Sequence, residues 1–276
     1  MPNEKEIRAL RFYQGDIDKK DMNDPFRGDA KAYVTLNSLL FPAGAGLAAE
    51  MARAAEGRRL NPVFIEESGR TIELLRTLRG LMKPECGNGP DAWEECGITE
   101  TFRVERLAEY RCIKDSGMLP SFISTSLEGF LPAYRDKKDL VLMNFHIRPG
   151  VPRADLGKLL AGNYAKKEEA EVLLAPYLPV RLRERSLIPA ETTVCDCLGR
   201  PPVIACDIWP GNAVLRDAGI SRMPRQKADD ILGNAAYPAA GIRVYEALNS
   251  GSMPEAGDKE KYLEFKSALQ CRVISG

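Results

Sequence analysis

The first hundred residues carry apolar positions at the spacing of α-helices. Over residues 66–83 they form one stripe with the arginines outside it, which predicts an amphipathic helix that ends before Pro84. A second helix is predicted over residues 36–58, interrupted by a proline and a glycine near its start. Residues 1–30 are polar and carry a charge-rich stretch, so we expect them to be irregular.

After residue 100 the pattern changes to short runs rich in β-branched, aliphatic and aromatic residues, separated by Pro, Gly and Asp. Such runs predict β-strands with mostly short connections. Helical spacing returns over residues 223–249 and again near 259–270. The runs predicted as strands are 102–107, 109–113, 122–127, 140–147, 170–174, 180–185 and 203–208.

These changes divide the chain into three regions. Residues 1–100 are predicted to form a mostly helical N-terminal region that packs on the core, residues 101–212 a β-rich core, and residues 213–276 a helical C-terminal extension. A chain of 276 residues can bury a substantial core without the help of metals or disulfides.

Composition narrows the classes of function. Lys plus Arg and Asp plus Glu each number 39, so the formal net charge is zero, which argues against a general nucleic-acid binder. The seven cysteines are odd in number and scattered, and a single C-x-C stands without a second pair at metal-ligand spacing. We therefore expect reduced, buried thiols and no metal site.

The start of the chain is polar, with no apolar segment of the secretory type, and no apolar run reaches the length of a membrane span. We expect a soluble protein that is made in the cytoplasm and makes no contact with a membrane. If it is exported, the route needs no cleaved hydrophobic signal.

Two short runs carry candidate chemistry. The hydroxyls of Ser124, Thr125 and Ser126 follow an apolar pair, which indicates a strand buried on at least one face, where hydroxyls need partners. Glu169 and Glu171 are two residues apart, so on an extended strand both carboxylates lie on one face. Two like charges on one face repel each other, which costs stability unless the pair has a function.

An Arg, then Ser-Thr-Ser, then Glu-x-Glu followed by Val-Leu-Leu resembles the mono-ADP-ribosyltransferase superfamily, over about residues 101–210. The resemblance implies an α+β fold, a split β-sandwich with an N-terminal helical layer and a C-terminal helical extension. In that fold NAD lies in the cleft between the sheets. The dinucleotide fingerprint of the other common NAD-binding fold is absent from this sequence.

The resemblance also implies roles for the two carboxylates. Glu171 would hold a ribose hydroxyl and stabilise the positive charge that develops on the ribose as nicotinamide leaves. Glu169 would position and deprotonate an arginine acceptor. Ser124 would orient Glu171 through a hydrogen bond.

Further residues take roles in cofactor and target binding by the same resemblance. Thr125 and Ser126 would shape the nicotinamide pocket, and Phe130 lies in a segment expected to close over NAD. Arg111 would bind the NAD pyrophosphate through a bidentate contact. Tyr164 lies on the turn before Glu169 and would help to recognise the target protein. If Arg111 does not serve, Arg103 and Arg106 are the alternative arginines.

The function implied is transfer of ADP-ribose from NAD to a protein, on arginine, with release of nicotinamide. NAD is then a substrate, and the partner is a target protein in a host or rival cell, as for bacterial toxins and virulence effectors; a cognate chaperone or immunity protein is a further possible partner. Thr, Asn, Cys or a nucleic acid stay open as acceptors. An NAD glycohydrolase and a non-catalytic interaction module are the alternatives.

Overall fold

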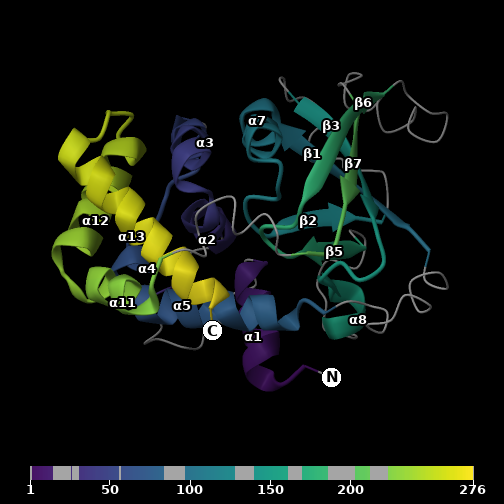
Figure 1. Ribbon diagram of the computed structural model, residues 1–276, viewed down its shortest axis with the longest axis horizontal. Helices are drawn as coiled ribbons and strands as arrows, with labels where there is room; N and C mark the ends of the chain where they lie inside the picture. The colour runs from purple at the N-terminus through teal and green to yellow at the C-terminus, as the bar shows by residue number, and fades with distance from the viewer. Residues whose placement is uncertain are drawn as a thin grey trace. The chain divides into compact units, whose positions relative to one another are not determined.

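The computed structural model of this chain describes residues 2–14, 26, 31–55, 57–83, 97–127, 140–160, 170–185, 203–211 and 223–275. The chain forms two compact units (Figure 1). One, called here the sheet unit, comprises residues 81–214; the other, the helical unit, comprises residues 2–80 together with 215–276. The first and last parts of the chain therefore fold into the same unit.

The sheet unit is built on seven strands in the order β4-β5-β2-β1-β3-β7-β6. Neighbouring strands are antiparallel except β3 and β7, which are parallel. The strands are β1 Thr99–Arg106, β2 Ile123–Ser126, β3 Leu140–Ile147, β4 Arg153–Asp155, β5 Glu171–Leu174, β6 Val180–Arg185 and β7 Val203–Ile208.

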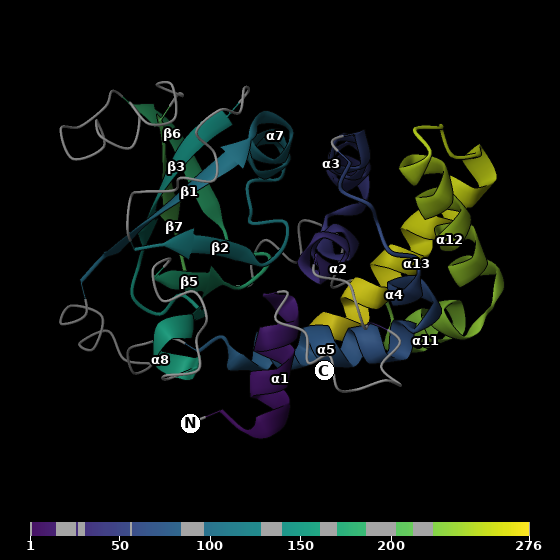
Figure 2. The same cartoon turned by 180° about the vertical axis from the view of Figure 1, so that it is seen from behind.

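The sheet has two parts that meet between β1 and β2. A single register pair, Phe102 with Ser126, joins these two strands. Figure 1 shows β2 and β5 lying across the direction of β1, β3 and β7, and Figure 2 shows the same crossing from behind. The expected α+β class, with helical N- and C-terminal regions and a split sheet, is confirmed.

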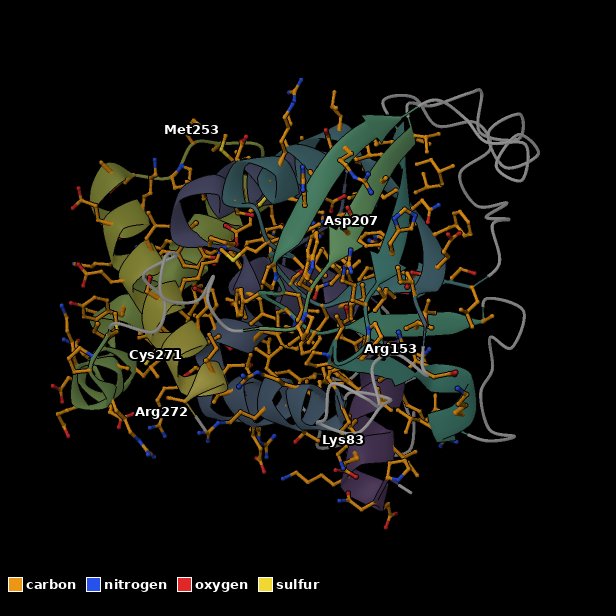
Figure 3. The ribbon with its side chains drawn as sticks, turned by 45° about the vertical axis from the view of Figure 1, so that its right-hand side comes forward. Lys83, Arg153, Asp207, Met253, Cys271 and Arg272 are labelled. Atoms are coloured by element: carbon orange, nitrogen blue, oxygen red, sulfur yellow. The ribbon has the colours of Figure 1, made fainter. Side chains whose placement is uncertain are left out.

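The core of the sheet unit surrounds the central strands β3 and β7. Seven of the eight residues of β3 and all six of β7 are buried. Strands buried on both faces need apolar residues at nearly every position, which explains the continuous apolar runs in the sequence. At the edge of the sheet unit, Lys83 pairs with Arg153 of β4 through two backbone hydrogen bonds of 3.1 and 3.3 Å (Figure 3).

Two helices belong to the described part of the sheet unit, α7 Leu107–Ser116 and α8 Leu156–Leu160. The strand predicted over residues 109–113 is wrong, because these residues form the middle of α7. Tyr110 and Ile113, three apart, are both buried, as on one side of a helix, and a run this short fits both periods. Gly117 ends α7 in the left-handed conformation, with φ 64°.

The helical unit confirms the amphipathic helix predicted over residues 66–83, which is α5. The interrupted helix predicted over residues 36–58 is two separate helices that end and begin around Pro42. The expected irregular start contains α1, which has a capping box between Asn3 and Glu6. The helices of this unit are α1 Glu4–Tyr13, α2 Ala32–Leu40, α3 Ala43–Ala55, α4 Val63–Glu66, α5 Ser68–Leu81, α11 Arg225–Gly233, α12 Ala236–Asn249 and α13 Ala256–Ile274.

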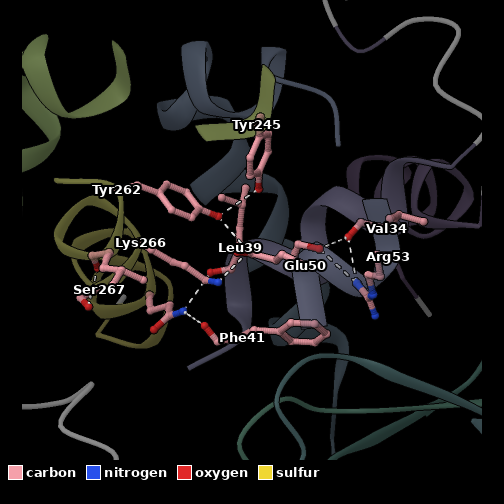
Figure 4. Close-up of polar contacts among 12 residues, drawn as sticks. Val34, Leu39, Phe41, Glu50, Arg53, Tyr245, Tyr262, Lys266 and Ser267 are labelled. Atoms are coloured by element: carbon pink, nitrogen blue, oxygen red, sulfur yellow. Dashed lines mark hydrogen bonds and ion pairs between the residues drawn. The ribbon is translucent and has the colours of Figure 1, made fainter. Parts of the chain in front are cut away.

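A buried ionic network ties α3, α12 and α13 together (Figure 4). Glu50 Oε1 accepts hydrogen bonds from Lys266 Nζ at 2.7 Å and from the Tyr262 hydroxyl at 2.8 Å. The Tyr262 hydroxyl also lies 3.3 Å from that of Tyr245. All four side chains are fully shielded from solvent, so the charges of Glu50 and Lys266 depend on each other.

Candidate functional site

Strands β2 and β5 bring the Ser-Thr-Ser run beside Glu171. Their antiparallel register sets Ser126 opposite Glu171 and Ser124 opposite Leu173. Residues directly opposite each other in such a pair present their side chains on the same face of the sheet. Ser124, Ser126 and Glu171 therefore share one face, here called the site face.

The side chains of Ser126 and Glu171 on the site face are shielded from solvent. Glu171 is 6% exposed and Ser126 is 5% exposed. A buried carboxylate is costly unless it is hydrogen-bonded or paired, so its place among hydroxyls is a specific arrangement. In such an environment a carboxylate also stabilises a nearby positive charge more strongly than it would in water.

Thr125 lies on the opposite face from the two serines, as alternation along a strand requires. Its hydroxyl donates to the carbonyl oxygen of Val172 at 2.9 Å, and the residue is buried. The contact fastens β2 to β5 next to the Ser126–Glu171 pair. Thr125 therefore holds the two strands together from the opposite face and does not lie on the site face with Ser126.

The residue before Glu171 has an unusual backbone. Ala170 has φ 40°, in the left-handed region that residues with a Cβ atom rarely adopt. Its carbonyl oxygen accepts a hydrogen bond from Leu127 N at 3.1 Å, just after the Ser-Thr-Ser run. The chain is thus turned and fixed at the point where Glu171 begins its strand.

Strand β1 extends the site face. Phe102 lies opposite Ser126, so alternation puts Arg106 on the site face and Arg103 and Glu105 on the other. The carboxyl of Glu105 is hydrogen-bonded to that of Glu109 on α7, so this contact with α7 is made on the face opposite to the site.

The three candidate arginines have different surroundings. Arg111 is exposed on α7, away from the site face. Arg103 is engaged inside the unit: its Nε donates to Glu105 Oε2 at 2.5 Å, and its terminal nitrogen donates to the carbonyl oxygen of Ser124 at 2.7 Å. Arg106 ends β1 and is the arginine that shares the site face with Ser126 and Glu171.

Sequence reasoning missed a buried acidic pair behind the site. Glu105 is 4% exposed and Glu109 is 5% exposed. Burial raises the pKa of Glu105 to about 7; Arg103 opposes this shift, and Glu109 adds to it by its charge and its hydrogen bond. Alternation along β1 pairs Glu105 with Arg103, but the assignment of residues 109–113 to a strand hid the contact with Glu109.

A second polar pair lies on the site face farther along the sheet. His146 Nδ1 lies 3.1 Å from Asp207 Oδ1. Asp207 Oδ2 also forms an ion pair with a terminal nitrogen of Arg183 at 2.9 Å. His146 is two residues beyond Asn144, which lies opposite Phe102. These contacts join β3, β7 and β6 through their side chains.

Three of the predicted site residues, Glu169, Phe130 and Tyr164, lie outside the described residues. Within the described ranges, the His, Cys, Asp and Glu side chains form no group of three or more that could hold a metal ion. No helix in the described part of the chain is long and apolar enough to span a bilayer.

Comparison with known proteins gives matches by structure alone. No family model matches the chain, and no curated protein matches it by sequence. The chain is similar to the ADP-ribosylating toxin BECa of C. perfringens, solved with NADH, at 15% identity and a TM-score of 0.42, over 75% of this chain and 44% of that one. It thus spans less than half of the length of BECa.

Two further solved structures are similar to this chain. For an ADP-ribosyltransferase from Clostridium botulinum, solved in a triclinic form, the identity is 14% and the TM-score 0.39, over 75% of this chain and 87% of that one. For the ADP-ribosyltransferase Vis from Vibrio splendidus, solved with agmatine, the values are 18% and 0.33, over 78% and 90%. All these TM-scores lie below 0.5, so the function has to be argued from the placement of the chain's own residues.

Proposed function

We propose that this protein transfers ADP-ribose from NAD to a protein acceptor, on arginine. The observation that carries the proposal is the register of β2 and β5, which sets the buried Glu171 opposite Ser126 on one face. A buried carboxylate beside a hydroxyl suits a reaction in which positive charge develops on a sugar.

The chemistry follows from this placement. The bond between the ribose carbon and the nicotinamide nitrogen breaks, and its electron pair leaves with nicotinamide. Glu171 stabilises the cationic ribose. For the hydroxyl that orients the carboxylate we propose Ser126, which lies opposite Glu171, in place of Ser124. A guanidinium nitrogen of the acceptor then bonds to the ribose carbon and gives up a proton, for which Glu169 is the proposed base.

For the pyrophosphate of NAD we propose Arg106 in place of Arg111. Arg106 is on the site face, whereas Arg111 is exposed on α7. Arg106 is four residues from Phe102 along β1, which is about 13 Å at 3.3 Å per residue. In NAD the pyrophosphate is attached to the 5′ carbon of the ribose that Glu171 is proposed to hold, so the long Arg106 side chain would have to reach back toward Glu171 to make a bidentate contact with the phosphates.

The proposal is tested by measuring nicotinamide release from NAD, with a protein mixture present and the ADP-ribose part of NAD labelled. Wild type should release nicotinamide and label a protein, and Glu171→Gln should lower both rates by about 10²–10³-fold, as for the loss of a charge-stabilising group. Arg111→Ala is the control and should keep wild-type rates.

Each other outcome has a defined meaning. Release by wild type without a labelled protein would make the enzyme an NAD glycohydrolase. A wild type that releases no nicotinamide with any acceptor would overturn the proposal and leave a binding module. Unchanged rates in Glu171→Gln would show that another group carries the charge. Circular dichroism of each variant shows whether it is folded.

A further inference from the structure

Arg103 links the candidate site to the buried acidic pair behind it. Its guanidinium, on the face opposite to the site, holds Glu105 Oε2 at 2.5 Å on one side and the carbonyl oxygen of Ser124 at 2.7 Å on the other. Ser124 is the first residue of the Ser-Thr-Ser run. The backbone that carries Ser126 is thus tied to a carboxylate on the neighbouring strand.

Glu105 is fixed from two directions. Its Oε1 accepts a hydrogen bond from the backbone N–H of Arg106, the N-cap residue of α7, at 3.2 Å. Its Oε2 accepts a hydrogen bond from Arg103 Nε. Its carboxyl is also hydrogen-bonded to that of Glu109, in the first turn of α7. Glu105 therefore connects the start of α7 with the side chain that holds β2.

The tie through Arg103 matters because β1 and β2 share little else. One register pair, Phe102 with Ser126, joins these strands, although β1 pairs with β3 along its whole length. The orientation of β2 against β1 is therefore set at few points, and the contact of Arg103 with the Ser124 carbonyl is one of them. A charge-assisted hydrogen bond is well suited to this purpose, since it is short and directional.

We propose that Glu105 is a positioning residue for the candidate site: it holds the Arg103 guanidinium against the Ser124 carbonyl and so keeps Ser126 in place opposite Glu171, while Glu109 modulates this hold through its contact with Glu105. The inference rests on the proposed function for the site's activity. The positioning itself is a property of β2 and can be measured without NAD.

The protonation of the pair governs the strength of the tie. Two carboxyls that share a buried site hold one proton until the pH passes the raised pKa of about 7 for Glu105. Among the described residues, the charged groups that act on Glu105 are Arg103 and Glu109. The residues of β2 and β3 on the same face carry no charge: Ile123, Thr125, Val141 and Met143.

An ionised Glu105 holds Arg103 more strongly than a protonated one does. The rate constant for NAD cleavage should therefore fall as the pH drops through about 7, the pKa of Glu105. Glu109→Gln removes the like charge and supplies an amide donor, and both changes favour the ionised form of Glu105. The acid limb of the pH profile should move down by about one pH unit in Glu109→Gln. A merely structural role would leave the limb where it is.

The experiment measures kcat and KM for nicotinamide release from pH 5 to 9 in wild type, Glu105→Gln and Glu109→Gln, with Glu100→Gln, an exposed residue of the same strand, as the control. Glu105→Gln should lower kcat by about tenfold, the usual effect of weakening one charge-assisted hydrogen bond, and leave KM within about twofold. A profile of Glu109→Gln that superimposes on that of wild type would overturn the proposal.

Hydrogen exchange of the β2 amides separates this inference from the proposed function. At pH 8, Glu105→Gln should lose about tenfold of the protection over residues 123–126, and Glu100→Gln should lose none. If wild type cleaves no NAD but β2 responds in this way, the proposed function fails and the positioning stands. If β2 protection is the same in all proteins, the positioning fails even when NAD is cleaved.

Discussion

Glu171 lies directly opposite Ser126 in the β2–β5 register, and Ser126 in turn lies opposite Phe102 of β1. The carboxylate, the hydroxyl and the ring therefore form one row across three strands. The row crosses the junction between the two parts of the sheet. A ligand bound over it would contact both parts, so the proposed site lies at the joint of the sheet.

We predict that Ser126→Ala lowers kcat for nicotinamide release by about 10–100-fold with little change in KM. The reason is that the hydroxyl positions Glu171, and a misplaced charge loses part of its effect on the transition state. Ser267→Ala, whose hydroxyl donates to a helix carbonyl in the helical unit, should behave as wild type. Full activity of Ser126→Ala would place the orienting group elsewhere.

We predict that the contribution of Glu105 to the free energy of unfolding falls as the pH rises from about 4.5 to 7. Its folded-state pKa of about 7 lies above the ordinary 4.5, so the folded state holds a proton that the unfolded chain has released. At 1.36 kcal/mol per unit over about 2.5 units, the loss is at most about 3.4 kcal/mol. Urea unfolding at pH 5 and 8 should show this slope in wild type and a smaller one in Glu105→Gln. Equal slopes would contradict the buried protonated pair.

We predict that Lys266→Met destabilises the protein by about 3–5 kcal/mol, because it leaves Glu50 charged and buried without a cation. Lys5→Met is the matched control: Lys5 and Glu73 approach as closely, at 2.6 Å, but both are largely exposed, so its cost should stay below about 1 kcal/mol. Thermal unfolding of the full chain measures both.

The double variant Lys266→Met with Glu50→Gln extends this test. It removes the uncompensated charge and should recover much of the lost stability. If the double variant is as unstable as the sum of the two single variants, the pair contributes by packing and not by mutual neutralisation.

We predict opposite effects for two glycine substitutions in helices. Gly80→Ala meets no atom within 4 Å and should stabilise by up to about 1 kcal/mol through helix propensity. Gly241→Ala would place its Cβ 3.1 Å from Ile65 Cδ1 and 3.2 Å from Tyr262 Cδ2, so overpacking should make it a net loss of about 1–2 kcal/mol. Chemical unfolding of both variants gives the two signs; a stabilising Gly241→Ala would mean that Ile65 and Tyr262 move aside.

Hydrophobic period alone predicts much of the fold. The stripe of α5 is unambiguous because it is sustained over a 14-residue helix. The apolar runs of β3 and β7 are identified as strands by their short length and by the Pro and Gly residues next to them. Residues 109–113 show the limit of this method, since five residues fit a strand and a helix equally. The helix is selected by packing of Tyr110 and Ile113 and by the left-handed Gly117 that ends it.

The candidate site is predictable as a set of residues but not as a geometry. The sequence contains Ser-Thr-Ser and Glu171, but the β2–β5 register that unites them depends on pairing between distant segments. The choice of arginine has the same origin. The position of Arg111 in the sequence makes it the first choice for the pyrophosphate. Only the structure shows that it lies on α7 and not on the site face. Roles for Glu169, Phe130 and Tyr164, and delivery to a target cell, stay predictions.

The discontinuous helical unit has a consequence for the order in which the chain is made. Glu50 and Lys266 are 216 residues apart, and the whole sheet unit lies between them. On the ribosome, the sheet unit is complete before α13 has been synthesised. The segments that form α1 to α5 are made first, but the ion pair between Glu50 and Lys266 cannot form until α13 has been synthesised. The sheet unit can thus reach its final state before the helical unit, which closes only after α13 has been made.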